Sequence, residues 1–230
     1  MSNPDAAANP ETPTPLDKPD LLRRRLEWSL TQEIMPFWDR FGVDRTYGGI
    51  TTGLDRQGRV IESDKSIWFH GRAAWVYSEA AMREIGFATD PRHRLDTARR
   101  ILHFLDRYGF NAELGRYRYR VTRAGEPLVT RRYLFSDCFA CIGHAAYARA
   151  ARSHDNDAEA ESSLRNAREI YERLMWHREQ PGTLTPKMDP DTRPTRGFAM
   201  PMILLKVSQE LRAADPERKE LYSARVDELI

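Results

Sequence analysis

The residues of this chain that are best suited to do chemistry lie within one short stretch, Ser66 to Trp75, which reads SIWFHGRAAW. Its apolar positions predict a mostly buried helix, and that helix carries Trp68, His70 and Arg72. A charged side chain that is buried without a partner is strongly unfavourable. Arg72 therefore either pairs with a nearby carboxylate or faces a polar ligand, and these residues alone leave both alternatives open.

Two cysteines, Cys138 and Cys141, stand close to His144 on a predicted apolar helix. Structural zinc sites have four ligands, and this trio lacks a fourth, so we predict no metal site. Two cysteines three residues apart also give no disulfide framework, which is typical of proteins from a reducing compartment. We therefore expect a cytoplasmic protein.

The composition indicates which partners to exclude. The 230 residues include 36 Lys and Arg and 34 Asp and Glu, for a net charge of +2. The basic residues alternate with acidic ones, which argues against a nucleic-acid surface. No apolar run approaches the roughly 20 residues that a membrane-spanning helix needs. Residues 1–16 are rich in Pro, Asn, Ala and Thr and predict a disordered tail, so residues 17–230 form the expected folded part.

Apolar periodicity predicts helices of two kinds that alternate along the chain. Helices with one apolar stripe and one charged face, typical of helices with one side in water, are expected at 91–108, 158–176 and 217–230. Helices that are apolar or small nearly all round, typical of helices enclosed by others, are expected at 67–85, 134–152 and 198–213. A further helix over 17–40 precedes them.

Two glycine-punctuated segments, 47–60 and 115–126, predict β-hairpins, each just before an enclosed helix. If the two kinds of helix run antiparallel in turn, all enclosed helices point the same way and begin at one rim. Helix N-termini offer free N–H groups to polar oxygens. Aromatic and polar side chains gathered at this rim therefore predict a pocket that suits a sugar.

Several blocks of residues carry a family resemblance. In order they are Trp38, Gly48-Gly49, Leu54 to Val60, Lys65, Trp68 to Arg72 with Trp75, Phe135 to Phe139, and Ala199 to Leu205. From about residue 20 to its end the chain resembles the N-acylglucosamine 2-epimerase family of sugar 2-epimerases. The resemblance implies an all-α fold, namely a partial (α/α)6 barrel of about seven of the twelve helices with short β-hairpins at one rim.

The segment Phe198-Ala199-Met200 lacks the histidine that isomerases and cellobiose 2-epimerases of this family usually have there. This favours the acylglucosamine epimerase branch, which implies interconversion of N-acetylglucosamine and N-acetylmannosamine. The resemblance further implies no required cofactor, a nucleotide such as ATP as activator, and a homodimer. The family's catalytic histidines belong to later segments that do not occur before Ile230, so we expect an incomplete fragment that is inactive alone.

Epimerisation at C2 of an opened amino sugar needs two acid/base groups and donors for the developing enediolate oxygen. We expect Arg72 to donate hydrogen bonds near the O1/O5 end of the sugar. Trp68 and Tyr47 are expected to pack on the ring. His70 and Asp137, where the family commonly has glutamine and glutamate, are expected to make supporting polar contacts.

Two alternatives stay open at this point. The first is a non-catalytic barrel remnant that binds a carbohydrate or a partner chain through its exposed edge. The second, within the family, is a mannose isomerase or a cellobiose 2-epimerase.

Overall fold

The computed structural model describes residues 19–83, 85–130, 133–180, 182–184, 188–189, 191–193 and 197–230. The predicted tail, residues 1–16, lies outside this described part. Within these ranges no helix combines the length and the hydropathy that a membrane span requires.

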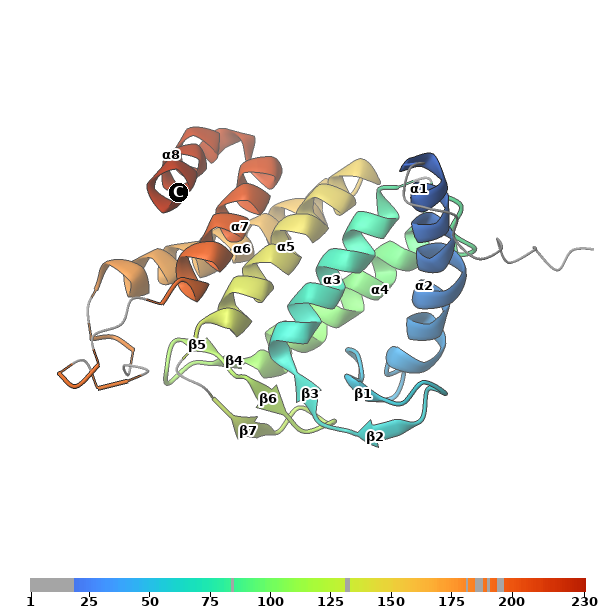
Figure 1. The fold of residues 1–230 in the computed structure, drawn as a ribbon, viewed down its shortest axis with the longest axis horizontal. Helices are drawn as coiled ribbons and strands as arrows, with labels where there is room; N and C mark the ends of the chain where they lie inside the picture. Colours follow the sequence, from blue (N-terminus) through green and yellow to red (C-terminus); the bar gives the residue numbers. More distant parts are fainter. Residues whose placement is uncertain are drawn as a thin grey trace, which may run out of the picture.

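The described chain folds into helices joined by short strands and loops (Figure 1). The first helical stretch consists of α1 (Pro19–Trp28), η1 (Ser29–Ile34), α2 (Met35–Phe37) and η2 (Trp38–Gly42), where the η segments are π-helical. The following helices are α3 (Ile67–Ala81), α4 (Pro91–Phe104), η3 (Leu105–Gly109), α5 (Phe135–Ser153), α6 (Asp157–Glu179), α7 (Ala199–Ala214), η4 (Pro216–Arg218) and α8 (Lys219–Leu229). Segment η3 is also π-helical, whereas η4 is a 3-10 helix. Every predicted helix is present, with ends displaced by a few residues.

The helices form two layers. In Figure 1, α3, α5 and α7 lie side by side, and all three begin at the lower edge, where the strands lie. Helices α4 and α6 lie behind them and return in the opposite direction. The inner layer therefore consists of the three helices whose sequences are apolar on most sides, and the outer layer of amphipathic helices, as their periodicity predicts.

Helix α5 is the centre of the fold, because it packs against α3, α4, α6 and α7. Most of its side chains are buried, and many are alanines, which allow neighbouring helices to come close. The closest approach is at Gly71 of α3, where an added Cβ atom would lie 2.2 Å from the carbonyl oxygen of Phe139. Only glycine fits at this crossing.

The described residues form seven short strands. These strands lie along the rim where the inner helices begin (Figure 1). They pair as β1 (Gly53–Leu54) with β2 (Val60–Glu62), β3 (Lys65–Ser66) with β6 (Arg120–Val121) and β6 with β7 (Pro127–Val129), and β4 (Phe110–Asn111) with β5 (Arg116–Tyr117). All of these pairs are antiparallel.

The structure corrects the predicted strand partners. Residues 115–126 do not form one hairpin, because Gly115 (φ 62°) lies in the turn between β4 and β5, and Gly125 (φ 102°) in the turn between β6 and β7. The two glycines thus mark two turns of two different hairpins, where the sequence pattern suggested the ends of one. In the 47–60 segment, Gly58 (φ 81°) lies in the turn between β1 and β2, so this hairpin extends to Glu62.

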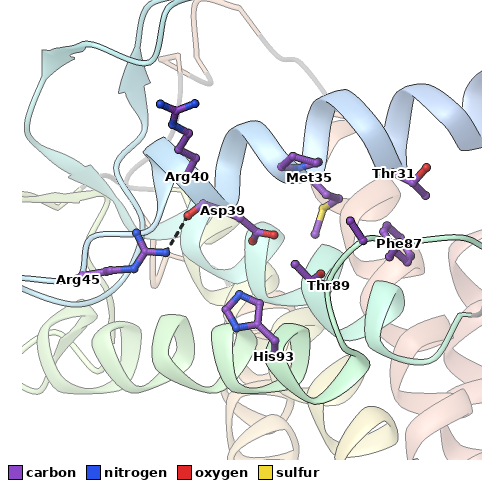
Figure 2. A pocket seen from close by; sticks show the side chains of 10 residues that line it. Thr31, Met35, Asp39, Arg40, Arg45, Phe87, Thr89 and His93 are labelled. Atoms are coloured by element: carbon purple, nitrogen blue, oxygen red, sulfur yellow. Dashed lines mark hydrogen bonds between the residues drawn. The ribbon is translucent and has the colours of Figure 1, made fainter. Parts of the chain in front are cut away.

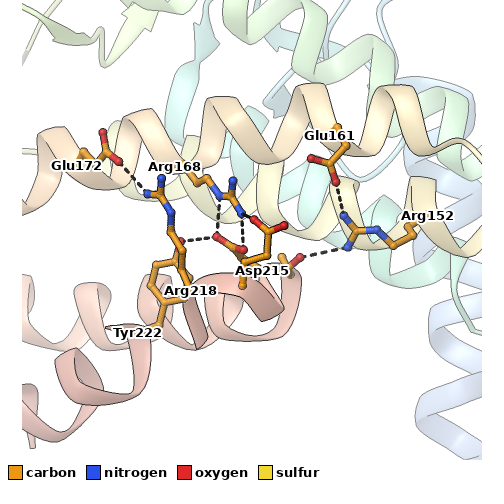
Figure 3. Close-up of polar contacts among 9 residues, drawn as sticks. Arg152, Glu161, Arg168, Glu172, Asp215, Arg218 and Tyr222 are labelled. Carbon is orange, nitrogen blue, oxygen red and sulfur yellow. Dashed lines mark hydrogen bonds and ion pairs between the residues drawn. The ribbon is translucent and has the colours of Figure 1, made fainter. Parts of the chain in front are cut away.

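A cluster of ion pairs fastens α7 and α8 to α6 (Figure 3). The fully buried carboxylate of Asp215, at the end of α7, accepts hydrogen bonds from Arg168 at 2.7 and 2.5 Å and from the Tyr222 hydroxyl at 2.8 Å. Arg168 also pairs with the exposed Glu217, and Arg218 pairs with Glu172. We call this cluster around Asp215 the bracket; it joins the end of α7 and the start of α8 to α6.

Candidate functional site: a cup at the start of three inner helices

A pocket of about 380 Å³ opens where the three inner helices begin. Its lining side chains come from the first two turns of α3, α5 and α7, from the connection between β5 and β6, and from the loop between β7 and α5: Trp68, Arg72, Tyr119, Tyr133, Phe135, Ser136, Phe139, Met202 and Ile203. We call this pocket the cup. It brings together segments that are more than one hundred residues apart in the chain, as expected if the inner helices share one direction.

Among the described residues, Arg72 is the one charged side chain that lines the cup. Its guanidinium lies 5.4 Å from the ring centroid of Trp68 and 5.0 Å from that of Phe139. Such cation–π contacts hold a guanidinium in place without using up its N–H donors. In the described part of the chain Arg72 has no ion pair or hydrogen bond, and it is exposed to solvent, so its donors are available to oxygen atoms of a ligand.

The helical geometry of α3 explains this placement. Trp68 and Arg72 are four residues apart and therefore lie on the same face, which is the face toward the cup. Gly71, on the neighbouring face, lets α5 come close enough for the Phe139 ring to reach Arg72. The sequence motif from Trp68 to Arg72 thus combines two side chains that line the cup with a glycine that allows α3 and α5 to pack closely.

His70 lies on the opposite side of α3 and does not line the cup. It is fully buried, its ring stacks on Phe104, its Nδ1 lies 2.8 Å from the Ser66 carbonyl oxygen, and its Nε2 accepts from the Ile50 N–H at 3.1 Å. These partners require a neutral ring with the proton on Nδ1. Burial lowers the pKa of His70 to about 4. His70 therefore holds the loop at Ile50 against α3 and has no nitrogen left for a ligand.

Asp137 is also buried and also lies outside the set of cup-lining side chains, although its neighbour Ser136 belongs to it. One carboxylate oxygen accepts from the Tyr117 N–H at 3.0 Å, and the other has no hydrogen-bond partner in the described part. Burial raises the pKa of Asp137 to about 7. The carboxylate therefore connects α5 to strand β5 behind the cup.

Tyr47 is half exposed on the loop before β1, where the Arg123 guanidinium lies 5.2 Å from its ring centroid. It too is absent from the cup lining. Of the five residues that the sequence suggested as a site, the structure brings Trp68 and Arg72 together and places the other three elsewhere.

The cysteines and His144 lie in the interior. Both thiols are buried, and burial raises the pKa of each. His144 bonds Asp106 through Nε2 and Ser163 through Nδ1, both at 2.9 Å. The described residues contain no cluster of His, Cys, Asp or Glu that could hold a metal ion.

Sequence reasoning missed most of the aromatic and apolar wall of the cup. Phe135 and Phe139 are four residues apart on an enclosed helix, and that spacing indicates a shared face. Tyr119, Tyr133 and Met202 carry no such signal, because their place depends on how the rim loops and α7 fold back.

Residues 48–230 match the sequence model of the N-acylglucosamine 2-epimerase (GlcNAc 2-epimerase) family. The chain belongs to this family. It is 28% identical to the N-acylglucosamine 2-epimerase of Mus musculus over 206 residues, which cover 87% of this chain and 46% of the relative. It is 30% identical to a cellobiose 2-epimerase of Ruminococcus albus over 143 residues, or 61% and 34% of the two chains. This family member thus spans about half the length of the curated relatives it matches.

Solved structures show the fold. A sugar epimerase from a ruminal bacterium superposes with a TM-score of 0.71 at 21% identity, covering 91% of this chain and 53% of the other. A D-mannose isomerase gives 0.69 at 15% identity, covering 95% and 51%. This epimerase-family chain is therefore a partial (α/α)6 barrel with short β-hairpins at one rim, as the resemblance implied.

Proposed function

We propose that the cup binds the ring of an N-acylated hexosamine and that the activity to which this chain contributes is the interconversion of N-acetylglucosamine and N-acetylmannosamine. The observation that carries the proposal is Arg72, an exposed guanidinium on two aromatic rings with no carboxylate partner in the described part. Guanidinium groups suit oxygen atoms that gain negative charge, such as O1 of an enediolate.

The side chains that line the cup favour an N-acylated amino sugar over other sugars. Trp68 and Phe139 offer flat surfaces for the apolar face of a sugar ring. The wall from α7 consists of Met202 and Ile203, which offer no hydrogen bond to a free 2-hydroxyl group. An acetamido methyl group loses less by contact with such a wall than a hydroxyl group does.

The described cup lining contains no histidine, aspartate or glutamate, so it supplies no acid/base pair for proton transfer at C2. We therefore propose that this chain binds the sugar without turning it over. A coupled assay with N-acetylmannosamine tests this part, and a measurable rate from the purified chain would overturn it.

A sugar panel tests the binding proposal. Calorimetric titrations should give saturable binding for N-acetylmannosamine and N-acetylglucosamine, and weaker binding for mannose and cellobiose. Tighter binding of cellobiose would favour the second candidate, a cellobiose 2-epimerase type, which the similarity to the Ruminococcus albus enzyme supports. No binding of any sugar would favour the non-catalytic, partner-binding alternative.

ATP activation, a homodimer and a cytoplasmic location belong to the same proposal. The first two rest on the family resemblance, and the location rests on the two cysteines, which give no disulfide framework. ATP in the titration cell should change the affinity for N-acetylmannosamine if a nucleotide acts on this half of the barrel. Light scattering on the eluting protein should give the mass of two 26.7 kDa chains if the homodimer forms.

A further inference from the structure

A second concave region lies between the 19–42 helix and α4, and none of its lining residues belongs to the cup. It consists of two adjoining cavities of about 420 and 400 Å³ that share Asp39, Arg45 and His93. Figure 2 shows the first cavity, with Arg45 at one end, Phe87 at the other, and Asp39 and His93 between them. We call the two cavities together the outer cleft.

Basic side chains gather in the second of these cavities. They are Arg45 from the loop after η2 and His93, Arg99, Arg100 and His103 from α4. The spacing of His93, Arg100 and His103 places them along one face of α4. All five of these basic residues are exposed, so a ligand in the cleft can reach them.

The acidic side chains of the cleft are already engaged. Asp44 is buried and bonded to Lys65 at 3.0 Å and to Arg123 at 2.8 Å, and these partners hold its pKa far below the usual range. Asp96 is shared by Arg99 and Arg100. Asp39 accepts from the Tyr77 hydroxyl at 2.7 Å.

Several hydrogen-bond donors of the cleft have few partners or none among the described residues. Arg45 donates to the Asp39 carbonyl oxygen at 3.3 Å and has no carboxylate partner in the described part. The rings of His93 and His103 have no hydrogen bond to any described residue. One carboxylate, Asp96, serves two guanidiniums. The cleft therefore has spare N–H donors, and the group of Asp96, Arg99 and Arg100 carries one net positive charge.

The other end of the cleft is apolar. Met35, Pro36, Phe87 and Ala88 line it, and the buried Arg94 holds the Phe87 ring with its guanidinium 4.3 Å from the ring centroid. Arg94 is in turn fixed by the carbonyl oxygens of Ala80 and Thr89. A flat apolar group can thus lie against Phe87 while an anionic group reaches Arg45.

We propose that the outer cleft binds a small phosphorylated molecule, with its phosphate among Arg45, His93 and Arg100 and its apolar part against Met35 and Phe87. A phosphate accepts hydrogen bonds in several directions at once, which matches donors that come from both walls of the cleft. A carboxylate has only two oxygen atoms in one plane and uses fewer of these donors.

Phenyl phosphate is a probe that carries both parts. Calorimetric titration of the 230-residue chain should give saturable binding of phenyl phosphate and at least about tenfold weaker binding of benzoate and of inorganic phosphate. R45A and H93A should each weaken phenyl phosphate binding by about tenfold, since each removes a hydrogen bond to a charged group. R59A, which removes an exposed arginine at the β1–β2 turn, and R72A, in the cup, should leave it unchanged.

Circular dichroism of each variant confirms that the fold is intact. Absence of saturable phenyl phosphate binding overturns the proposal, as does equal binding in R45A and R59A. Equal affinity for benzoate overturns the assignment to phosphate, and loss of binding in R72A places the ligand in the cup. None of these outcomes depends on whether the cup binds a sugar.

Discussion

The charged groups at the bracket and at the rim differ in whether they have hydrogen-bond or ion-pair partners. At the bracket, Arg168 and the fully buried Asp215 satisfy each other, and Tyr222 adds a further hydrogen bond (Figure 3). At the rim, Arg72 lies on aromatic rings without a carboxylate among the described residues. Several buried polar atoms near the rim also lack a hydrogen-bond partner there: Ser66 Oγ, Arg118 Nε, Asp137 Oδ2 and Arg173 Nε.

This difference indicates which charged groups contribute to the stability of the fold and which are available to bind a ligand. A saturated buried pair stabilises the fold only as a unit, and removing one partner leaves the other charge buried and unpaired. An exposed group without a partner, such as Arg72, contributes little to stability but keeps its capacity to bind a ligand. Changes at the bracket should therefore affect unfolding, and a change at Arg72 should affect ligand binding.

The largest effect is expected at the bracket. D215A leaves Arg168 without its buried partner and should lower the free energy of unfolding by about 3 kcal/mol or more. Chemical denaturation measures this loss. The matched control is E217A, which removes the exposed carboxylate on the same arginine and should cost less than about 1 kcal/mol. Equal losses in the two variants would contradict the distinction between the two carboxylates.

A smaller effect on stability is expected from the helix crossing that shapes the cup. G71A puts a methyl group against the Phe139 carbonyl oxygen and forces α3 and α5 apart, at about 1–3 kcal/mol. Because Phe139 also lies against Arg72, affinity for N-acetylmannosamine should fall as well. G197A, at a position with no atom within 4 Å of the added Cβ, is the control. Equal free energies of unfolding for G71A and G197A would contradict the claim that α3 and α5 cross closely at Gly71.

A third prediction concerns the pH dependence of stability, and over the single pH unit from about 6 to about 7 its effect is the smallest of the three. Unfolded Asp137 loses its proton near its ordinary pKa of 3.8, whereas the folded protein keeps that proton until about pH 7. Between these values the folded state binds more protons, so this carboxyl makes stability fall as pH rises, and above pH 7 the penalty stays constant. Between pH 6 and 7 alone, D137N should gain about 1 kcal/mol relative to the wild-type protein.

Denaturation curves at several pH values test this prediction. E113Q, which changes an exposed carboxylate between β4 and β5, should run parallel to the wild-type protein. A D137N curve that is also parallel would show that Asp137 is ionised in the folded protein.

Much of the fold could be predicted from the sequence, because helical periodicity reports which face of each segment is buried. It identified α3, α5 and α7 as enclosed helices. The spacing of Trp68 and Arg72, four residues apart, agrees with the face that they share in the structure. The roles of His70 and Asp137 could not be predicted in the same way. Asp137 is one residue from Ser136 of the cup, and His70 is two residues from both Trp68 and Arg72. Each step along a helix turns a side chain by about 100°, so Asp137 points toward β5 and His70 toward the Ile50 loop.

The outer cleft shows a second reason why a site cannot be predicted from the sequence. The spacing of His93, Arg100 and His103 is visible in the sequence, but Arg45 joins them from a loop about fifty residues earlier. Side chains that meet through tertiary structure alone leave no local pattern. The same reason hid Met202 and Tyr119 from the predicted cup.

The most direct test of the account is the affinity of R72A for N-acetylmannosamine, measured by titration calorimetry beside the wild-type chain. Because Arg72 is exposed and has no ion pair in the described part, we expect an unchanged unfolding midpoint and a loss of affinity of about tenfold or more. Unchanged affinity in R72A would contradict the claim that the sugar site lies where the three inner helices begin.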